Sequence, residues 1–177
     1  TQLTQAIDIA KKIGDKRGEG SNLGNIGLIY AEQGQHDRAV EHFTQAIDIA
    51  KEIGNKRSEG IHLGNLGDIL LQKNQLKEAE EAFRQAIPIN DETFPLASGV
   101  FRASLALLLA QKGQFDEAQA LLETGEPQVA AYPSEHAKFI CKKGQVHLLA
   151  GERKTAQKAL DHAKALAVEH KLENDSE

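Results

Sequence analysis

The sequence predicts an all-α protein, a solenoid of antiparallel helix pairs, on three observations. Residues 4–29 recur without a gap as residues 44–69, and 19 of the 26 aligned positions are identical. Apolar side chains recur at the i, i+3, i+4 spacing of amphipathic helices along most of the chain. Turn residues, mostly glycine, separate these stretches. A long fixed period indicates stacked repeats, in which each helix pair buries its apolar face against its neighbours.

The composition argues against several classes of protein. With 40% hydrophobic and 27% charged residues and a mean hydropathy of −0.44, the 177-residue chain is typical of a soluble, ordered protein. No apolar run is long enough to span a bilayer, so we expect no membrane association. A net charge of −5 and an aromatic content of 5% argue against nucleic-acid binding. The single cysteine, Cys141, and the lack of a signal peptide favour a reducing compartment and a cytoplasmic protein.

The first predicted helix, residues 2–13, is followed by Gly14 as a stop and by Asp15 as the expected N-cap of the next helix. It matches the second helix of a repeat whose first helix is absent. The chain also lacks methionine, so we expect a piece of a longer protein. The apolar face of this helix should be partly exposed or should pair with a second copy, through Leu3, Ile7 and Ala10.

The repeat markers divide the chain into one array. We expect residues 1–14 to be the second helix of a truncated repeat, followed by repeat 1 (15–54), repeat 2 (55–92), a degenerate repeat 3 (93–132), repeat 4 (133–171) and the start of a missing helix (172–177). The turn residues keep step at spacings of 40, 39 and 38, at Gly34, Asn74, Gly113 and Gly151. Pro88 and Pro127 occupy the same register and should kink or end the second helix of their repeats.

The repeat pattern resembles the tetratricopeptide repeat, on the residues Leu23, Gly27, Tyr30, Ala39, Phe43 and Ala46. Its longer period, with Leu-Gly-Asn at 23–25 and 63–65, is similar to the Leu-Gly-Asn-repeat adaptors, the kinesin light chains and the arrays of bacterial signalling proteins. The resemblance implies a right-handed superhelix with a concave groove. Gly27 and Gly67 should let the paired helix approach, and Phe43 and Phe83 should fill the space between successive pairs.

The candidate site is the face of each first helix that lines the groove in such a superhelix. We expect a partner to contact Arg17, Ser21, Asn25 and Leu28 in repeat 1, Arg57, Asn65 and Asp68 in repeat 2, Ser104 and Leu107 in repeat 3, and Lys142 and Gln145 in repeat 4. An asparagine amide offers both donor and acceptor to a peptide backbone. An arginine can hold a carboxylate through two hydrogen bonds.

The chain shows no pattern typical of an enzyme, a metal site or a cofactor site. His36 and His42 are six residues apart, which places them on different faces of a helix, and no His-Glu-x-x-His run occurs. Cys141 has His136 and His147 near it in sequence, but neither spacing aligns a base with the thiol. We therefore expect no catalytic residues, no metal and no cofactor.

The sequence favours a non-enzymatic scaffold that binds a protein or peptide partner in its groove, within a larger multidomain protein. The alternative is a regulatory, self-associating module that packs on an upstream kinase, cyclase or nucleotide-binding domain, or on another copy through its ends. Solenoid proteins bind their partners on concave surfaces, which favours the first interpretation.

Overall fold

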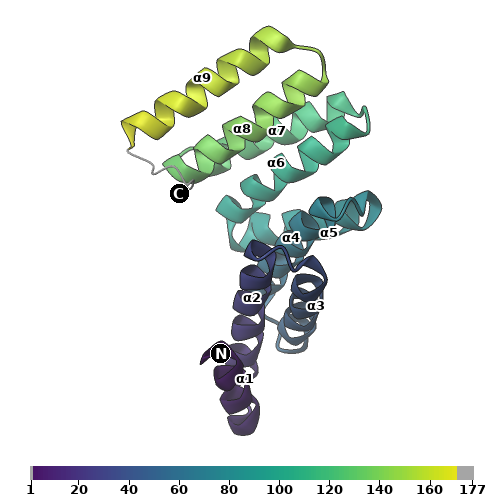
Figure 1. Ribbon diagram of the computed structural model, residues 1–177, viewed down its shortest axis with the longest axis vertical. Coiled ribbons are helices and arrows are strands. Elements are labelled where there is room, and N and C mark those ends of the chain that lie inside the picture. The colour runs from purple at the N-terminus through teal and green to yellow at the C-terminus, as the bar shows by residue number, and fades with distance from the viewer. Residues whose placement is uncertain (1, 171–177) are drawn as a thin grey trace. The chain divides into compact units, whose positions relative to one another are not determined.

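The protein was analysed as a computed structural model, which describes residues 2–170 (Figure 1). Within that range all regular secondary structure is helical, as predicted. The helices are α1 (Gln2–Ile13), α2 (Lys16–Glu32), α3 (His36–Glu52), α4 (Lys56–Gln72), α5 (Leu76–Thr93), α6 (Pro95–Gln111), α7 (Phe115–Val129), α8 (Pro133–Leu149) and α9 (Arg153–Glu169). The expected helix at 172–177 lies outside the described residues.

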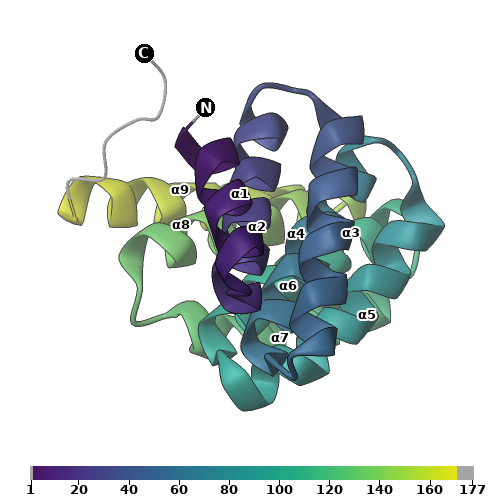
Figure 2. The same ribbon diagram turned by 90° about the horizontal axis from the view of Figure 1, so that it is seen from below.

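Consecutive helices pack as antiparallel pairs, which are α2 with α3, α4 with α5, α6 with α7 and α8 with α9. The chain divides into two compact units, Thr1–Phe94 and Pro95–Glu177. Unit 1 contains α1 to α5 and unit 2 contains α6 to α9. Figure 2 shows α1, α2 and α3 of unit 1 running side by side. None of the described helices combines the length and the apolar character needed to cross a membrane.

The helices begin and end on local signals that were visible in the sequence. The predicted turn residues Gly34, Asn74, Gly113 and Gly151 have φ angles of +70°, +58°, +78° and +80°, in the left-handed region that suits a helix C-terminus. Oδ1 of Asp15 accepts a hydrogen bond of 2.9 Å from the amide of Gly18, which confirms the predicted N-cap. Asn55 caps α4 in the same way, through the amide of Ser58 at 3.2 Å.

The two interior prolines do not end their helices. The helix α5 continues past Pro88 to Thr93, and α7 continues past Pro127 to Val129, so the predicted termination is wrong. Proline removes the hydrogen bond to the carbonyl four residues earlier. Both Pro88 and Arg84 are exposed, so water can solvate the carbonyl that the proline leaves unpaired.

The core of unit 1 lies where successive pairs meet. Phe43 is fully buried and clusters with Ala39 and with Ile69 of α4, as expected for a residue wedged between pairs 1 and 2. A Cβ atom placed on Gly27 would lie 3.0 Å from the Phe43 ring, and one on Gly67 would lie 2.8 Å from the Phe83 ring. The predicted role of both glycines in close helix approach is confirmed.

The apolar face of α1 is more buried than the sequence predicted. Ile7 and Ala10 are buried, and Ile7 joins a cluster with Leu23, Ile26 and Ile49 of the following pair. Their predicted exposure is therefore wrong, because α2 covers this face. The side chain of Leu3 lies outside the described part. The apolar residues that α1 does expose are Ile9 (58%) and Ile13 (72%).

Candidate functional site

The first helix of each pair lies on the inner side of its unit. In unit 1, α2 contacts α4, whereas α3 makes no contact with α5 among the residues described. In unit 2, α6 contacts α8, and over residues 95–170 α7 makes none with α9. A stack whose helices approach on one side and separate on the other is bent toward the close side. The inner surfaces are therefore those of α2 and α4 in unit 1 and of α6 and α8 in unit 2.

The inner surface of α2 carries the predicted polar stripe. Arg17, Ser21, Asn25 and Leu28 are all exposed, while Leu23, Ile26 and Gly27 on the other side of the helix are buried. Steps of three and four residues place the exposed set on one face at about 100° per residue. This helix can therefore offer an amide, a hydroxyl, a guanidinium and one apolar side chain to a partner.

The inner surface of α4 repeats the stripe with less exposure. Arg57 is exposed and its guanidinium lies 4.2 Å from the centre of the Phe94 ring, a cation–π arrangement that holds the side chain in place. Asn65 and Asp68 are half-buried. The sequence repeat thus brings Arg17 and Asn25 of α2 into register with Arg57 and Asn65 of α4.

His62 sets the distance between the two stripes. A Cβ atom on Gly24 would lie 2.2 Å from Cε1 of His62, so only glycine lets α2 and α4 approach as they do. Burial lowers the pKa of His62 below its usual value, and its buried Nδ1 atom has no hydrogen-bond partner within the described chain. Arg17 and Ser21 line a small cleft beside this ring. His62 was not predicted from the sequence, although Gly24 of the Leu-Gly-Asn motif indicates a position where a neighbouring side chain can approach the helix closely.

Two buried carboxylates support the start of each inner helix. Glu59 in α4 receives a 2.7 Å ion pair from Lys56. Glu19 occupies the same register in α2 and lies 3.8 Å from Lys16. An ion pair to a buried carboxylate compensates its desolvation only when the geometry is good. The pair on Glu59 has the shorter distance of the two, and both lie in the first turn of the helix that carries Arg17 or Arg57.

Unit 2 arranges its predicted site residues differently. Ser104 is only 1% exposed and its hydroxyl accepts a 2.6 Å hydrogen bond from Nζ of Lys142. Leu107 is half-buried, and Gln145 is exposed. The structure therefore joins Ser104 to Lys142. Because α6 is apolar and buried around most of its circumference, the polar stripe of unit 1 is not repeated on α6.

Three histidines outside the stripe are engaged in local contacts. His147 Nδ1 lies 2.9 Å from Oε2 of Glu152, and His136 Nε2 lies 3.5 Å from Oε1 of Glu126. His42 Nδ1 lies 2.8 Å from the carbonyl oxygen of Arg38. Over the described residues no three His, Cys, Asp or Glu side chains are close enough to hold a metal ion.

Comparison with family models identifies the repeat. A model of the tetratricopeptide repeat matches residues 1–52 and 19–92, and a second tetratricopeptide repeat model matches residues 99–124. No curated protein gives a significant match. The first model alone spans more than half of the chain.

Solved structures share the fold at low sequence identity. The crystal structure of BtubC (BKLC) from P. vanneervenii is 18% identical, with a TM-score of 0.72 over 99% of this chain and 82% of the other. A Podosopora anserina putative kinesin light chain with nearly identical TPR-like repeats is 20% identical, with a TM-score of 0.72 over 97% and 86% of the two chains. The apo form of RapI is 17% identical, with a TM-score of 0.70 over 96% of this chain and 61% of its own. With its repeat models matched, its glycine-mediated helix contacts in place and these structures alike in fold, the chain belongs to the tetratricopeptide repeat family.

Proposed function

We propose that this protein is a non-enzymatic interaction scaffold and that the inner surface of α2 and α4 binds an extended segment of a partner protein. The tetratricopeptide repeat fold suggests an interaction scaffold. The observation that supports this surface is the pair Asn25 and Asn65, which occupy one register of neighbouring helices. The contact between His62 and Gly24 holds those helices at a defined separation.

The chemistry of the surface favours an extended and acidic segment. The two asparagine amides offer hydrogen bonds to main-chain groups whatever the side chains of the partner are. Arg17 and Arg57 add two cations that suit carboxylates. Leu28 adds an exposed apolar side chain on α2. The proposal includes a place inside a larger cytoplasmic protein, in keeping with the single thiol Cys141.

An array of synthetic extended peptides of graded net charge tests this proposal on the full chain. Acidic peptides should bind, and replacing Asn25 and Asn65 together by alanine should weaken binding by roughly 2 kcal/mol, or about thirtyfold. The melting temperature should hardly change, because solvent-facing helix positions tolerate alanine.

A matched control exists on the outer helices. Gln45 and Gln85 are exposed amides, also one repeat apart, on α3 and α5. Their double replacement by alanine should leave peptide affinity unchanged. If the asparagine and glutamine variants bind alike, the inner surface is not the binding site.

One observation favours the alternative of a regulatory, self-associating module. The helix α1 exposes Ile9 and Ile13 on a face that none of the described residues covers. Under the alternative, sedimentation velocity should show a concentration-dependent dimer, and replacing both isoleucines by aspartate should abolish it. A monomer at all concentrations would reject this self-association.

A further inference from the structure

A cleft in unit 2 lies on the outer side, where α7 and α9 separate and leave part of α8 open between them. Its volume is about 200 Å³. Its walls include Glu126 of α7, Ile140 and Lys143 of α8, and Thr155, Lys158 and His162 of α9. Because both outer helices that form the walls are present, this cleft lies inside the stack and not at its open end.

The repeat register shows that the cleft occupies a place that is apolar in unit 1. The turn residues that set the period align each wall residue with one of unit 1. Three positions that are apolar there carry polar side chains in unit 2, which are Glu126 for Ile47, Lys143 for Leu66 and His147 for Leu70. Ile47 and Leu70 are buried. Polar groups at such positions cost free energy unless they are satisfied, so three replacements around one cleft indicate a role beyond packing.

The α9 wall of the cleft also reverses the charge of its counterpart in unit 1. Glu78 and Glu81 of α5 are exposed carboxylates, and the same positions of α9 hold Thr155 and Lys158. Lys158 makes no ion pair with any residue in the described range. The wall therefore changes from two carboxylates to a hydroxyl group and an unpaired ammonium group.

The one carboxylate that lines the cleft is already paired. Oε2 of Glu126 lies 2.7 Å from Nζ of Lys143, and Oε1 lies 3.5 Å from Nε2 of His136. An ammonium group has three hydrogen-bond donors. Lys143 therefore keeps donors for a ligand after it has bound Glu126.

Hydrogen-bond donors outnumber acceptors in this cleft. Two ammonium groups, two imidazole rings and a hydroxyl group line it beside the single carboxylate. With neutral histidines, the charges of Lys143 and Lys158 against that of Glu126 leave one net positive charge. Charge-assisted donors of this kind favour an anion with several acceptor oxygens. A phosphoryl group has three such oxygens and about 1.5–2 negative charges.

The size of the cleft limits the rest of the ligand. Pockets for drug-sized molecules have volumes of about 300–1,000 Å³, so a cleft of about 200 Å³ suits a smaller molecule. Ile140 is buried and Ala159 is half-buried at its wall. They offer a small apolar surface to a short carbon skeleton.

We propose that the cleft between α7, α8 and α9 binds a small phosphate monoester. Lys143 and Lys158 hold the charge of its phosphoryl group from two helices, and Thr155 and His162 offer further hydrogen bonds to its oxygens. Its carbon skeleton lies on Ile140 and Ala159. The site belongs wholly to unit 2 and does not depend on the peptide surface proposed on α2 and α4.

Isothermal titration calorimetry of the full chain in a buffer without phosphate tests the proposal. The probe is O-phosphoserine, and serine is its matched control without the phosphoryl group. O-phosphoserine should bind at least about tenfold more tightly than serine. Inorganic phosphate should compete with it, because the phosphoryl group provides the main contacts.

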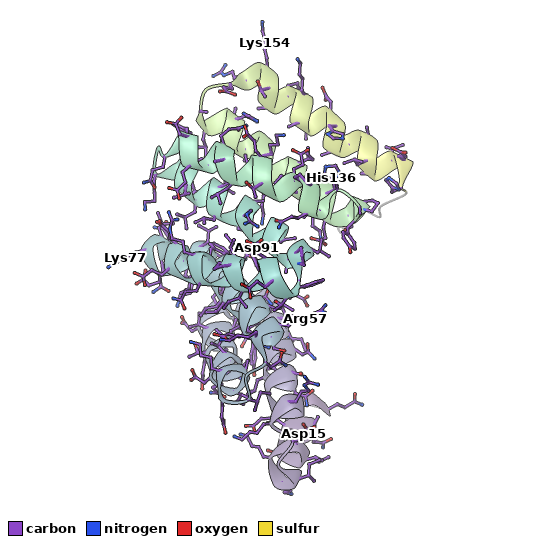
Figure 3. The ribbon with its side chains drawn as sticks, turned by 180° about the vertical axis from the view of Figure 1, so that it is seen from behind. Asp15, Arg57, Lys77, Asp91, His136 and Lys154 are labelled. Atoms are coloured by element: carbon purple, nitrogen blue, oxygen red, sulfur yellow. The ribbon has the colours of Figure 1, made fainter. Side chains whose placement is uncertain are left out.

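Two lysines of α9 provide matched variants. Lys158→Gln should weaken O-phosphoserine binding at least about tenfold, while Lys154→Gln should change it less than about twofold. Both side chains are exposed and both replacements remove one positive charge, but Lys154 does not line the cleft. Figure 3 shows Lys154 extending away from the body of α9. Circular dichroism verifies that each variant keeps its fold.

Three results would overturn the proposal. The first is no binding of O-phosphoserine at about 10 mM. The second is an equal effect of Lys158→Gln and Lys154→Gln, which would reduce the binding to nonspecific attraction. The third is a phosphoserine pentapeptide that binds at least about tenfold more tightly than O-phosphoserine, which would assign the cleft to a phosphorylated protein.

Discussion

Unit 1 and unit 2 are built from the same helix pair, yet they leave different surfaces open. In unit 1 the inner helices expose a polar stripe, and α4 packs on the apolar surface formed by α2 and α3. In unit 2 the inner helix α6 is mostly buried, and Ser104 accepts a hydrogen bond from Lys142. The corresponding apolar surface of α8 and α9 is not covered by any described helix. Unit 1 therefore exposes polar side chains on its inner face, whereas unit 2 exposes apolar side chains on α8 and α9.

One pair of core positions also differs between the units. In unit 1 a glycine faces a phenylalanine, at Gly27 with Phe43 and Gly67 with Phe83. In α6 and α7 the same positions hold the buried residues Ala106 and Leu122. The larger inner residue compensates for the smaller outer one, and such volume-conserving exchanges are well tolerated.

In α8 and α9 this compensation is missing, because the same positions hold Gly144 and Leu160. A Cβ atom on Gly144 would meet only Ala159 at 3.4 Å and the carbonyl of Ala156 at 3.5 Å, which are ordinary contacts. The contrast teaches that a core position of a repeat is buried by the helix that follows it in the stack, and that the same position is exposed where no described helix packs on the pair.

The largest expected effect is on the phenylalanine of unit 1. Phe43→Ala should lower the free energy of unfolding by about 3–5 kcal/mol, because it removes a fully buried ring between two pairs. Leu160→Ala, at the same register of α9, should cost within about 1 kcal/mol because its side chain is partly exposed. Urea unfolding measures both. Equal losses would contradict the difference described between the units.

The facing glycines should respond with opposite signs. Gly27→Ala should destabilise the protein by about 1–3 kcal/mol, because its new methyl group would press on the Phe43 ring. Gly144→Ala should stabilise it by up to about 1 kcal/mol through helix propensity, since nothing obstructs the methyl group. Thermal melts of the two variants provide the test. Destabilisation by Gly144→Ala would mean that α8 and α9 are already tightly packed around Gly144.

Acid should weaken the two units in different pH ranges. Burial lowers the pKa of His62 below 6.5, so the unfolded chain binds this proton more readily than the folded one. The stability associated with neutral His62 is complete above pH 6.5 and is lost as the pH falls below it. Unit 1 should therefore lose stability in mild acid.

In unit 2 the corresponding range lies lower. Burial alone would raise the pKa of Glu126, but the hydrogen bond and charge of Lys143, with help from His136, lower it below 4.5. Its contribution is kept above pH 4.5 and is lost as the pH falls further. Urea midpoints measured from about pH 8 to about pH 3 should show that His62→Leu flattens the upper range and Glu126→Gln only the lower one. The reverse assignment would contradict both.

The smallest stability effect is expected for the arginines of the inner surface. Arg17→Ala and Arg57→Ala together should change the free energy of unfolding by no more than about 1 kcal/mol, most of it from the lost contact of Arg57 with Phe94. Association with an acidic peptide from the array should nevertheless slow, and its salt dependence should flatten. Stopped-flow kinetics at two ionic strengths measures this. Unchanged rates would remove the arginines from the proposed site.

Much of the fold was accessible from local sequence signals. The turn residues, the cap at Asp15 and the burial of Phe43 all follow from residues within one or two repeats of each other. The candidate stripe on α2 was also accessible, since helical periodicity places Arg17 and Asn25 on one face. The continued helix at Pro88 was not, because whether a proline ends a helix depends on solvent access to the freed carbonyl.

The sequence by itself determined the helix pairs, their period and the residues at which pairs meet, because these depend on spacing and on glycine at fixed positions. Only the tertiary structure decided which surfaces remain open. It showed that Ile7 and Ala10 are covered and that Ser104 is buried against Lys142. It also showed that His62 packs on Gly24 and that no described residue covers the surface of α8 and α9 that lies away from α6. The physical reason is that exposure depends on the neighbouring helices in space, and a residue's own periodicity does not specify which neighbour covers it.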